Sequence, residues 1–238
     1  GLGAKLVREA YWVNETVFWR PSPEDRARIV RTGRVQDVED GLSEFPHVIV
    51  NQARMQEYLL DYMRRSPTRL APDYGVEFVR LDVEAEGDHP VVAHVRNVDD
   101  GAERSIRAKY VVGCDGARSL VRRSIGAELH GDYANHAWGV MDMLAVADFP
   151  DIRLKAAIQS ADDGNILLIP REGGYLVRLY VDLGEVDPDK RDAVRHTSAE
   201  EVAERARRVL RPYTLDVRNI VWFSVYEVGQ RLADRFDD

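Results

Sequence analysis

The run from Leu167 to Val181 places two cations and a phenol among aliphatic side chains. Its centre, Gly173-Gly174, is a strong signal for a two-residue hairpin turn between antiparallel strands. Side chains alternate between the two faces of a strand, so the hairpin has two distinct sides. One face is apolar: Leu168, Pro170, Val177, Leu179 and Val181. The other is mixed: Leu167, Ile169, Arg171, Leu176, Arg178 and Tyr180.

The mixed face of this hairpin allows two interpretations. A half-solvated sheet surface would carry such residues, and so would the wall of a ligand pocket, where a few polar groups lie in apolar surroundings. The predicted register pairs Ile169 with Arg178 and Leu167 with Tyr180. An error of one residue would exchange the two faces, so the pattern alone leaves both interpretations open.

A second candidate site follows the apolar residues 110–112, where the chain reads Gly-Cys-Asp-Gly and a short helix is expected near 118–125. A strand, a glycine-containing turn and a helix in this order commonly hold a phosphate or a ribose. Asp115 could accept hydrogen bonds from a ribose or, as an ordinary capping residue, from nearby backbone N–H groups. Gly116 permits a close approach of the backbone. Cys114 has no plausible local base, which favours a small buried thiol over a nucleophile.

Hydrophobic spacing predicts the elements that position these groups. Asn51 is a good N-cap for a helix over 51–65, in which apolar residues recur three and four positions apart. A second helix is expected between Ser198, its N-cap, and Pro212. A slip in alternation near Val79 indicates a β-bulge. Strands are expected over 76–86, 91–98, 105–112, 139–147, 154–160, 165–170, 175–183 and 218–228.

The composition excludes several classes of protein. In 238 residues there are 33 Lys and Arg against 41 Asp and Glu, a net charge of −8, which argues against a nucleic-acid partner. Hydrophobic residues make up 45%, enough for a core. No apolar run approaches the ~20 residues that span a bilayer, so no membrane partner is expected. A single cysteine indicates a reducing, cytoplasmic location. The histidines show no metal-ligand spacing.

A family resemblance rests on several motifs together. The segment Cys114–Arg122 resembles the Asp-Gly motif of the flavoprotein aromatic hydroxylases, which include para-hydroxybenzoate hydroxylase and phenol hydroxylase. Further segments resemble the same family: Ser43–Arg54, Phe149–Arg153, Ile169–Glu172, Val177–Val181 and Trp222–Arg231. They are most similar to the phenol hydroxylase and 3-hydroxybenzoate 4-hydroxylase branch.

The resemblance implies a fold and a division into domains. The expected class is α+β or α/β, with part of a three-layer FAD/NAD(P)-binding domain interleaved with a substrate domain on a mainly antiparallel sheet. The incomplete flavin domain is expected over 46–132 together with 1–10, and the substrate domain over 11–45 and 133–238. The Gly1–Leu6 run lacks the last glycine of the family's Gly-x-Gly-x-x-Gly turn, and the later Gly-Asp motif is absent. The chain is therefore expected to be the middle of a larger enzyme and inactive in isolation.

The resemblance also implies a reaction and the residues that serve it. NADPH reduces FAD, O2 adds to the flavin, and the oxygenated flavin hydroxylates a small phenolic ring. Tyr180 matches the tyrosine that contacts the phenolic oxygen, and Arg171 matches an active-site arginine, with one extra residue between them. Tyr226 is expected to face the substrate. The residues matched to the cofactor are Gln52, Asp115, Gly116, Arg118 and Arg231.

Other functions stay open at this point. The chain could be a non-catalytic domain that binds an aromatic ligand or a partner chain without flavin. Within the enzyme class, the substrate could be a polycyclic or polyketide aromatic. Each matched residue also has a purely structural interpretation, such as packing for Tyr180 and a surface position for Arg171. The branch resembles dimers, so a homodimer is possible.

Overall fold

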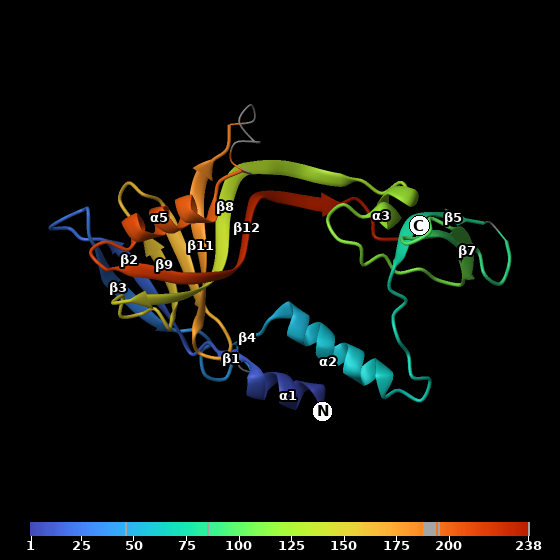
Figure 1. Ribbon diagram of the computed structural model, residues 1–238, viewed down its shortest axis with the longest axis horizontal. Helices are drawn as coiled ribbons and strands as arrows, with labels where there is room; N and C mark the ends of the chain where they lie inside the picture. Colours follow the sequence, from blue (N-terminus) through green and yellow to red (C-terminus); the bar gives the residue numbers. More distant parts are fainter. Residues whose placement is uncertain (46, 85, 188–193, 195, 238) are drawn as a thin grey trace. The chain divides into compact units, whose positions relative to one another are not determined.

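The computed structural model describes residues 1–45, 47–84, 86–187, 194 and 196–237 (Figure 1). The chain forms two compact units, each discontinuous in sequence. The first unit comprises Gly1–Tyr62 and Ala134–Val228, and the second comprises Met63–Tyr133 and Gly229–Asp238. This division by compactness differs from the predicted domains at residues 1–10, 46–62, 133 and 229–238, and the domain assignment stays a prediction.

The first unit is built on a seven-stranded sheet with the strand order β12-β8-β11-β10-β9-β2-β3. The strands are β2 (Glu15–Pro21), β3 (Ile29–Gln36), β8 (Leu129–Ala147), β9 (Lys155–Gln159), β10 (Asn165–Pro170), β11 (Leu176–Glu185) and β12 (Leu215–Ala233). The pairs β2/β3, β9/β10, β10/β11 and β8/β11 are antiparallel, whereas β2/β9 is parallel. The long strands β8 and β12 also contribute residues to the second unit. The predicted mixed α/β class with a largely antiparallel sheet is confirmed.

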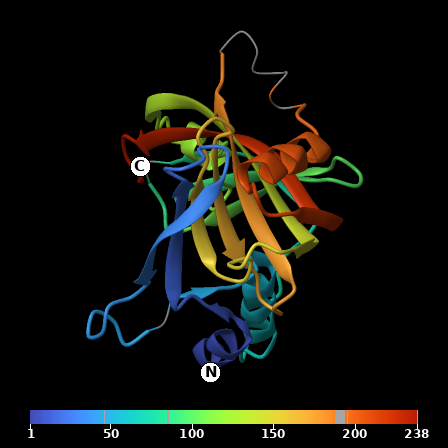
Figure 2. The ribbon, with the colours of Figure 1, turned by 90° about the vertical axis from the view of Figure 1, so that its left-hand side faces the viewer.

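One face of this sheet forms the core with helix α5 (Ala199–Val209), which lies across it (Figure 2). The buried face of α5 includes Val202, Ala203 and Ala206. A Cβ on Gly139 of β8 would lie 2.6 Å from a methyl of Val202, so this glycine permits the close helix–sheet contact. Ser198 caps the helix as predicted, within a complete capping box.

The β10/β11 hairpin has the predicted register. Ile169 pairs with Arg178 and Leu167 with Tyr180, and both glycines of the turn have positive φ, +85° and +78°. The predicted apolar face is the buried one: Leu168, Pro170, Val177, Leu179 and Val181. The mixed face therefore points away from α5.

Two helices, α1 and α2, come from the N-terminal segment of the chain. Helix α2 (Gln52–Arg64) begins one residue after Asn51, whose Oδ1 accepts a hydrogen bond of 2.9 Å from the Ala53 N–H. Its Tyr58 is 2% exposed and donates a hydrogen bond to Glu9 of α1 (Leu2–Glu9). A two-stranded ladder, β1 (Tyr11–Trp12) with β4 (Val48–Ile49), completes this region.

The second unit contains a three-stranded antiparallel meander, as predicted. Its strands are β5 (Val76–Val83), β6 (Val91–Asn97) and β7 (Glu103–Ala108). The register slips between Phe78 and Arg80, which confirms the predicted bulge. The short helix α3 (Leu120–Ser124) contacts β5, where the Ser124 hydroxyl accepts a 3.2 Å hydrogen bond from the Leu81 N–H.

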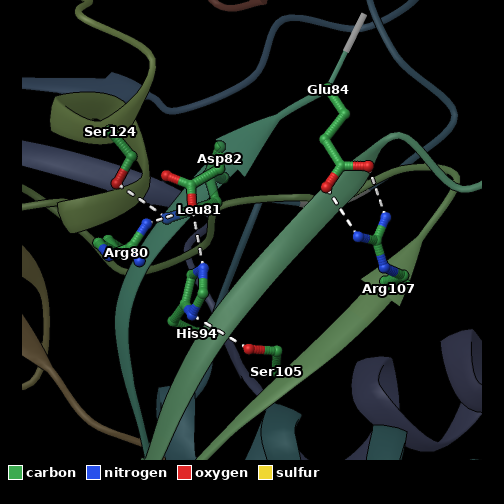
Figure 3. Close-up of polar contacts among 8 residues, drawn as sticks. All are labelled: Arg80, Leu81, Asp82, Glu84, His94, Ser105, Arg107 and Ser124. Carbon is green, nitrogen blue, oxygen red and sulfur yellow. Dashed lines mark hydrogen bonds and ion pairs between the residues drawn. The ribbon is translucent and has the colours of Figure 1, made fainter. Parts of the chain in front are cut away.

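One face of the meander carries a polar ladder (Figure 3). His94 Nε2 lies 2.8 Å from Asp82 Oδ2, and His94 Nδ1 lies 3.1 Å from the Ser105 hydroxyl. Glu84 receives two hydrogen bonds, of 2.6 and 2.7 Å, from Arg107. These contacts connect all three strands, and cross-strand pairs of this kind stabilise a sheet.

Two predictions for the segment after β7 are wrong. The third strand ends at Ala108 instead of continuing to Val112, and in the described part of the chain residues 109–115 pair with no strand. Tyr110 and Val112 are 86% and 83% exposed. Cys114 is exposed as well, although a buried thiol was expected. An apolar sequence becomes a strand only where a neighbouring strand satisfies its backbone groups.

Candidate active site and flavin pocket

The mixed face of the hairpin continues across the seven-stranded sheet. Tyr180 pairs with Leu167 on one side and with Val140 of β8 on the other, so an apolar band surrounds its phenol. Arg178 pairs in the same way with Ile169 and with Asp142. The face therefore combines aliphatic surface with a few polar groups, which is the composition of a small-molecule site.

Arg178 is the centre of a polar cluster on this face. Its Nε and Nη2 atoms donate hydrogen bonds of 2.6 and 2.7 Å to the two carboxylate oxygens of Asp142. Its guanidinium carbon lies 5.1 Å from the ring centroid of Trp222 and 5.9 Å from that of Tyr180, both within the range of cation–π contacts. The hydrogen bonds to Asp142 raise the pKa of Arg178, so this cation is permanent.

Two phenols lie beside this cation. Arg178 Nη1 is 3.5 Å from the Tyr180 hydroxyl oxygen, the upper limit for a hydrogen bond. Burial and the nearby Tyr180 raise the pKa of Tyr226, and Arg178 partly opposes the shift. Tyr226 therefore stays protonated at neutral pH and can donate a hydrogen bond. We call Asp142, Arg178, Tyr180, Trp222 and Tyr226 the phenol cluster.

Arg171 is buried, contrary to the surface interpretation. Its side chain is 8% exposed, and its contact with Glu172 Oε1 is 3.4 Å long. The other carboxylate oxygen of Glu172, Oε2, is buried and accepts no hydrogen bond from the residues that the structure describes. Among the residues that the structure describes, the Arg171 guanidinium makes this one contact, with Glu172.

The site residues predicted from the sequence omit three members of the phenol cluster, Asp142, Arg178 and Trp222, although Arg178 was placed on the mixed face of the hairpin. Asp142 interrupts an apolar strand, Val-Met-Asp-Met-Leu from Val140 to Leu144, and a buried carboxylate requires a cationic partner. That signal was available in the sequence. The identity of the partner was not, because Asp142 and Arg178 are 36 residues apart and meet only through the β8/β11 register.

The second unit holds a pocket of about 650 Å³, within the range of small-molecule sites. It is lined by parts of β5, β6 and α3, by residues 111–113, 115 and 116, and by residues 231–233 and 235–237. Asp115, Gly116 and Arg231, which sequence motifs had assigned to a cofactor, all line it. Arg122 and Arg235 also line it, so three arginines border one cavity.

The Asp115 carboxylate holds the start of α3. One oxygen accepts a 2.5 Å hydrogen bond from the Ser119 hydroxyl, and the other accepts bonds of 2.6 and 3.1 Å from the N–H groups of Leu120 and Val121. Burial alone would raise the pKa of Asp115, but these three hydrogen bonds hold the pKa below its usual value. Asp115 therefore helps the N-cap residue Ser119 to cap α3, which is the structural interpretation that the sequence left open.

Two glycines shape the same turn. Gly116 has φ +76°, a conformation that favours glycine, and a Cβ there would meet nothing within 4 Å. A Cβ on Gly113 would lie 2.7 Å from the Cβ of Val121, so the chain passes directly against α3. The backbone at Gly116 is consequently open to a ligand, while Gly113 is packed.

The remaining two cofactor candidates lie elsewhere. Arg118 is exposed and is outside the pocket lining; its backbone carbonyl accepts a 3.4 Å hydrogen bond from Arg123. Gln52 is the exposed first residue of α2 in the first unit. Their roles toward a cofactor stay predictions.

Comparisons with known proteins establish the family of the chain. Residues 5–238 match the FAD binding domain family, and the chain belongs to it. The resemblance to FAD-dependent aromatic hydroxylases drawn from the motifs is thereby confirmed.

Two relatives show the range of similarity. The chain is 53% identical over 237 residues to 3-hydroxybenzoate 4-monooxygenase of Comamonas testosteroni, covering 98% of this chain and 37% of the relative. It is 33% identical over 236 residues to phenol 2-monooxygenase fsqG of Aspergillus fumigatus, covering 99% of this chain and 38% of the relative. The chain thus spans less than two fifths of the length of these relatives.

Solved structures share the fold at low sequence identity. p-Nitrophenol 4-monooxygenase PnpA from Pseudomonas putida aligns with a TM-score of 0.72 at 16% identity, covering all of this chain and 57% of that one. The flavin-dependent monooxygenase PieE, in complex with FAD and substrate, aligns with a TM-score of 0.71 at 18% identity, covering all of this chain and 42% of that one.

Proposed function

We propose that this chain is the central part of an FAD-dependent monooxygenase that hydroxylates a small phenolic compound with NADPH and O2. The phenol cluster carries the proposal: Tyr180 and Tyr226 lie beside a permanent cation, Arg178, on a face that also carries aliphatic side chains. The relatives named as hydroxybenzoate and phenol monooxygenases support it.

The pocket of the second unit suits FAD. Its volume, its three arginines and the open backbone at Gly116 fit a ligand that combines a pyrophosphate with ring systems. Arg231, Arg122 and Gly116 would hold the cofactor, and Asp115 would support the turn by capping α3. When bound and reduced by NADPH, FAD supplies the activation of O2 and the transfer of one oxygen atom to the ring.

The residues of the first unit act on the substrate. A phenolic ring becomes more electron-rich when its proton is partly withdrawn, and the Tyr180 hydroxyl can both donate to and accept from the phenolic oxygen. The Arg178 cation favours a developing phenolate. The buried Arg171 and the protonated Tyr226 would add donors at the same face. The aliphatic residues around Tyr180 would bind the ring and exclude water.

The wider assignments belong to the same proposal. We assign residues 46–132 with 1–10 to the flavin domain, and 11–45 with 133–238 to the substrate domain. No described helix is both long and apolar enough to cross a bilayer. The single cysteine and the net charge of −8 support a cytoplasmic enzyme that binds small molecules rather than nucleic acid. A homodimer is the proposed assembly.

Tyr180→Phe in the full-length enzyme tests the role of the phenol cluster. We expect the hydroxylated product formed per NADPH to fall about a hundredfold, the lower end of the effect of one positioned proton-transfer group. NADPH oxidation and peroxide release should continue. Tyr175→Phe, at the exposed tip of the same hairpin, is the matched control. Coupled turnover that is unchanged in Tyr180→Phe would remove Tyr180 from the mechanism.

Absorbance separates the enzyme from a domain that binds an aromatic ligand without flavin. A purified protein with a flavin band at about 450 nm supports the proposal, because oxidised flavin is the chromophore that the reaction requires. A colourless full-length protein that takes up no added FAD would favour the flavin-free alternative.

A further inference from the structure

Asp182 anchors three segments of the substrate face. Its Oδ1 atom accepts hydrogen bonds from His136 Nε2 at 2.6 Å and from the Gly184 N–H at 2.8 Å. Its Oδ2 atom accepts a 2.9 Å bond from Asn165 Nδ2. The carboxylate is nearly buried, at 7% exposure for the residue. One side chain of β11 thus connects β8, β10 and the continuation of its own strand.

This anchor coincides with an irregularity in the sheet. The β8/β11 register shifts between Asp182 and Gly184, and Gly184 has φ +88°. A bulge interrupts the ladder and changes the direction of nearby side chains. The Asp182 carboxylate binds the Gly184 N–H, a backbone donor at the bulge that would otherwise need another acceptor.

Tyr180 lies between two anchored positions of the same strand. Asp182 follows it by two residues and Arg178 precedes it by two, so all three side chains share a face, with Cα atoms about 7 Å apart along the strand. Arg178 is held by Asp142 of β8, and Asp182 is held by His136 of the same strand. The contact of the Tyr180 hydroxyl with Arg178 is 3.5 Å long, too weak to fix the ring by itself.

We propose that Asp182 is a positioning residue for Tyr180. By fixing the bulge, it sets the direction in which the Tyr180 ring leaves the sheet and keeps its hydroxyl within reach of the substrate oxygen. The role rests on the proposed hydroxylase function. A displacement of about 1 Å at a reacting group can cost a hundredfold in rate. A carboxylate that touches no substrate can therefore still control coupling, which is the amount of hydroxylated product formed per NADPH oxidised.

Asp182→Ala in the full-length enzyme is the first variant. We expect the product formed per NADPH to fall about tenfold, while flavin content and the rate of NADPH oxidation stay within about twofold of the wild type. Asp182→Asn keeps an acceptor for Gly184 and should recover most of the coupling. Glu185→Gln changes an exposed carboxylate of the same strand and should leave coupling unchanged. Unchanged coupling in Asp182→Ala would overturn the proposal.

A double-mutant cycle with Tyr180→Phe separates positioning from a general structural effect. If Asp182 acts through Tyr180, adding Asp182→Ala to Tyr180→Phe lowers coupling no further. Independent, multiplicative losses would overturn the positioning role. If Asp182→Ala fails to fold, Asn165→Ala is the substitute, because it removes one hydrogen-bond donor to Asp182. It should lower the product formed per NADPH by a smaller factor. In a protein that already carries Tyr180→Phe, it should cause no further loss.

The outcome for the wild type distinguishes the two proposals. A wild-type enzyme that hydroxylates phenols while Asp182→Ala remains fully coupled would overturn the positioning role alone. A wild-type enzyme that holds FAD but hydroxylates no phenol would overturn the proposed function, and the positioning role with it.

Discussion

Asp142 and Arg178 form an ion pair on the proposed substrate face. The Asp142 side chain is 9% exposed and that of Arg178 is 22% exposed, and two hydrogen bonds join them. Removing one partner leaves the other charge poorly solvated, whereas removing both need not destabilise the protein. Each of the two charged side chains therefore stabilises the fold only while its partner is present.

Two variants test the contribution of this ion pair to stability. Asp142→Ala should destabilise the enzyme by about 3 kcal/mol, because it leaves the Arg178 cation largely buried without its carboxylate. The double variant Asp142→Leu with Arg178→Met should recover most of that loss. Urea unfolding followed by circular dichroism measures both. A double variant less stable than Asp142→Ala would show that the loss does not come from an unpaired charge.

At the scale of residues, the sequence was enough to predict individual residues of the candidate site but not most of the residues that they contact. The alternation of the hairpin identified Tyr180, Arg171 and the polar face, because those residues are close in sequence. Asp142 reaches Arg178 from another strand, and His136 reaches Asp182 past a register shift. Such contacts depend on the long-range register, which local spacing does not determine.

At the scale of elements, the segment at Gly113 and helix α3 form one packed unit. A Cβ on Gly113 would lie 2.7 and 2.8 Å from two carbons of Val121, far inside van der Waals contact. A larger residue must displace α3, and with it the N–H groups that Asp115 holds. The geometry of the proposed flavin pocket is thus coupled to one glycine.

Gly113→Ala should accordingly weaken FAD binding in the full-length enzyme. We expect at least a tenfold rise in the dissociation constant for FAD, because the displaced helix carries the Arg122 that lines the pocket. Titration of the apoenzyme with FAD, followed by quenching of flavin fluorescence, gives the constant. Gly3→Ala, in helix α1 with nothing within 4 Å of the added Cβ, is the control. Equal affinity in the two variants would contradict the coupling.

Local patterns predicted most elements after residue 50, but they missed helix α1 and the strands β1 to β4 and extended β7 too far. Helix α1 was not expected, since its eight residues carry no cap side chain; it instead packs through Glu9 and Lys5 against Tyr58. The apolar residues 110–112 were expected to extend a strand, but strand formation depends on a partner that the local sequence does not reveal. The predictions of the β10/β11 hairpin and of the β5–β7 meander were correct because short turns determine which strands pair.

At the scale of the whole molecule, acidic groups outnumber basic ones by eight, and many carboxylates are held by donors. Asp37 shows this most clearly. It accepts hydrogen bonds from the Thr16 hydroxyl at 2.8 Å, from Lys155 Nζ at 2.9 Å and from His47. Burial would raise the pKa of Asp37, but these donors lower it to about 2. Hydrogen bonds also lower the pKa values of Asp82, Glu84 and Asp115, although partial burial opposes each shift.

These shifts predict a loss of stability in acid with a defined sign. A carboxylate whose pKa is lower in the folded state than in the unfolded chain, about 3.9 for Asp, stabilises the fold above that unfolded value. The stabilisation disappears as the pH falls toward the folded pKa, which for Asp37 is about 2. The urea midpoint of the protein should therefore be nearly constant from about pH 7 to 5 and should decline steeply below about pH 4.

Asp37→Asn should lower the urea midpoint at neutral pH and make its decline in acid shallower. Asp73→Asn, at an exposed position, is the control and should reproduce the wild-type profile. An Asp37→Asn profile parallel to that of the wild type would show that this carboxylate does not contribute to the acid transition.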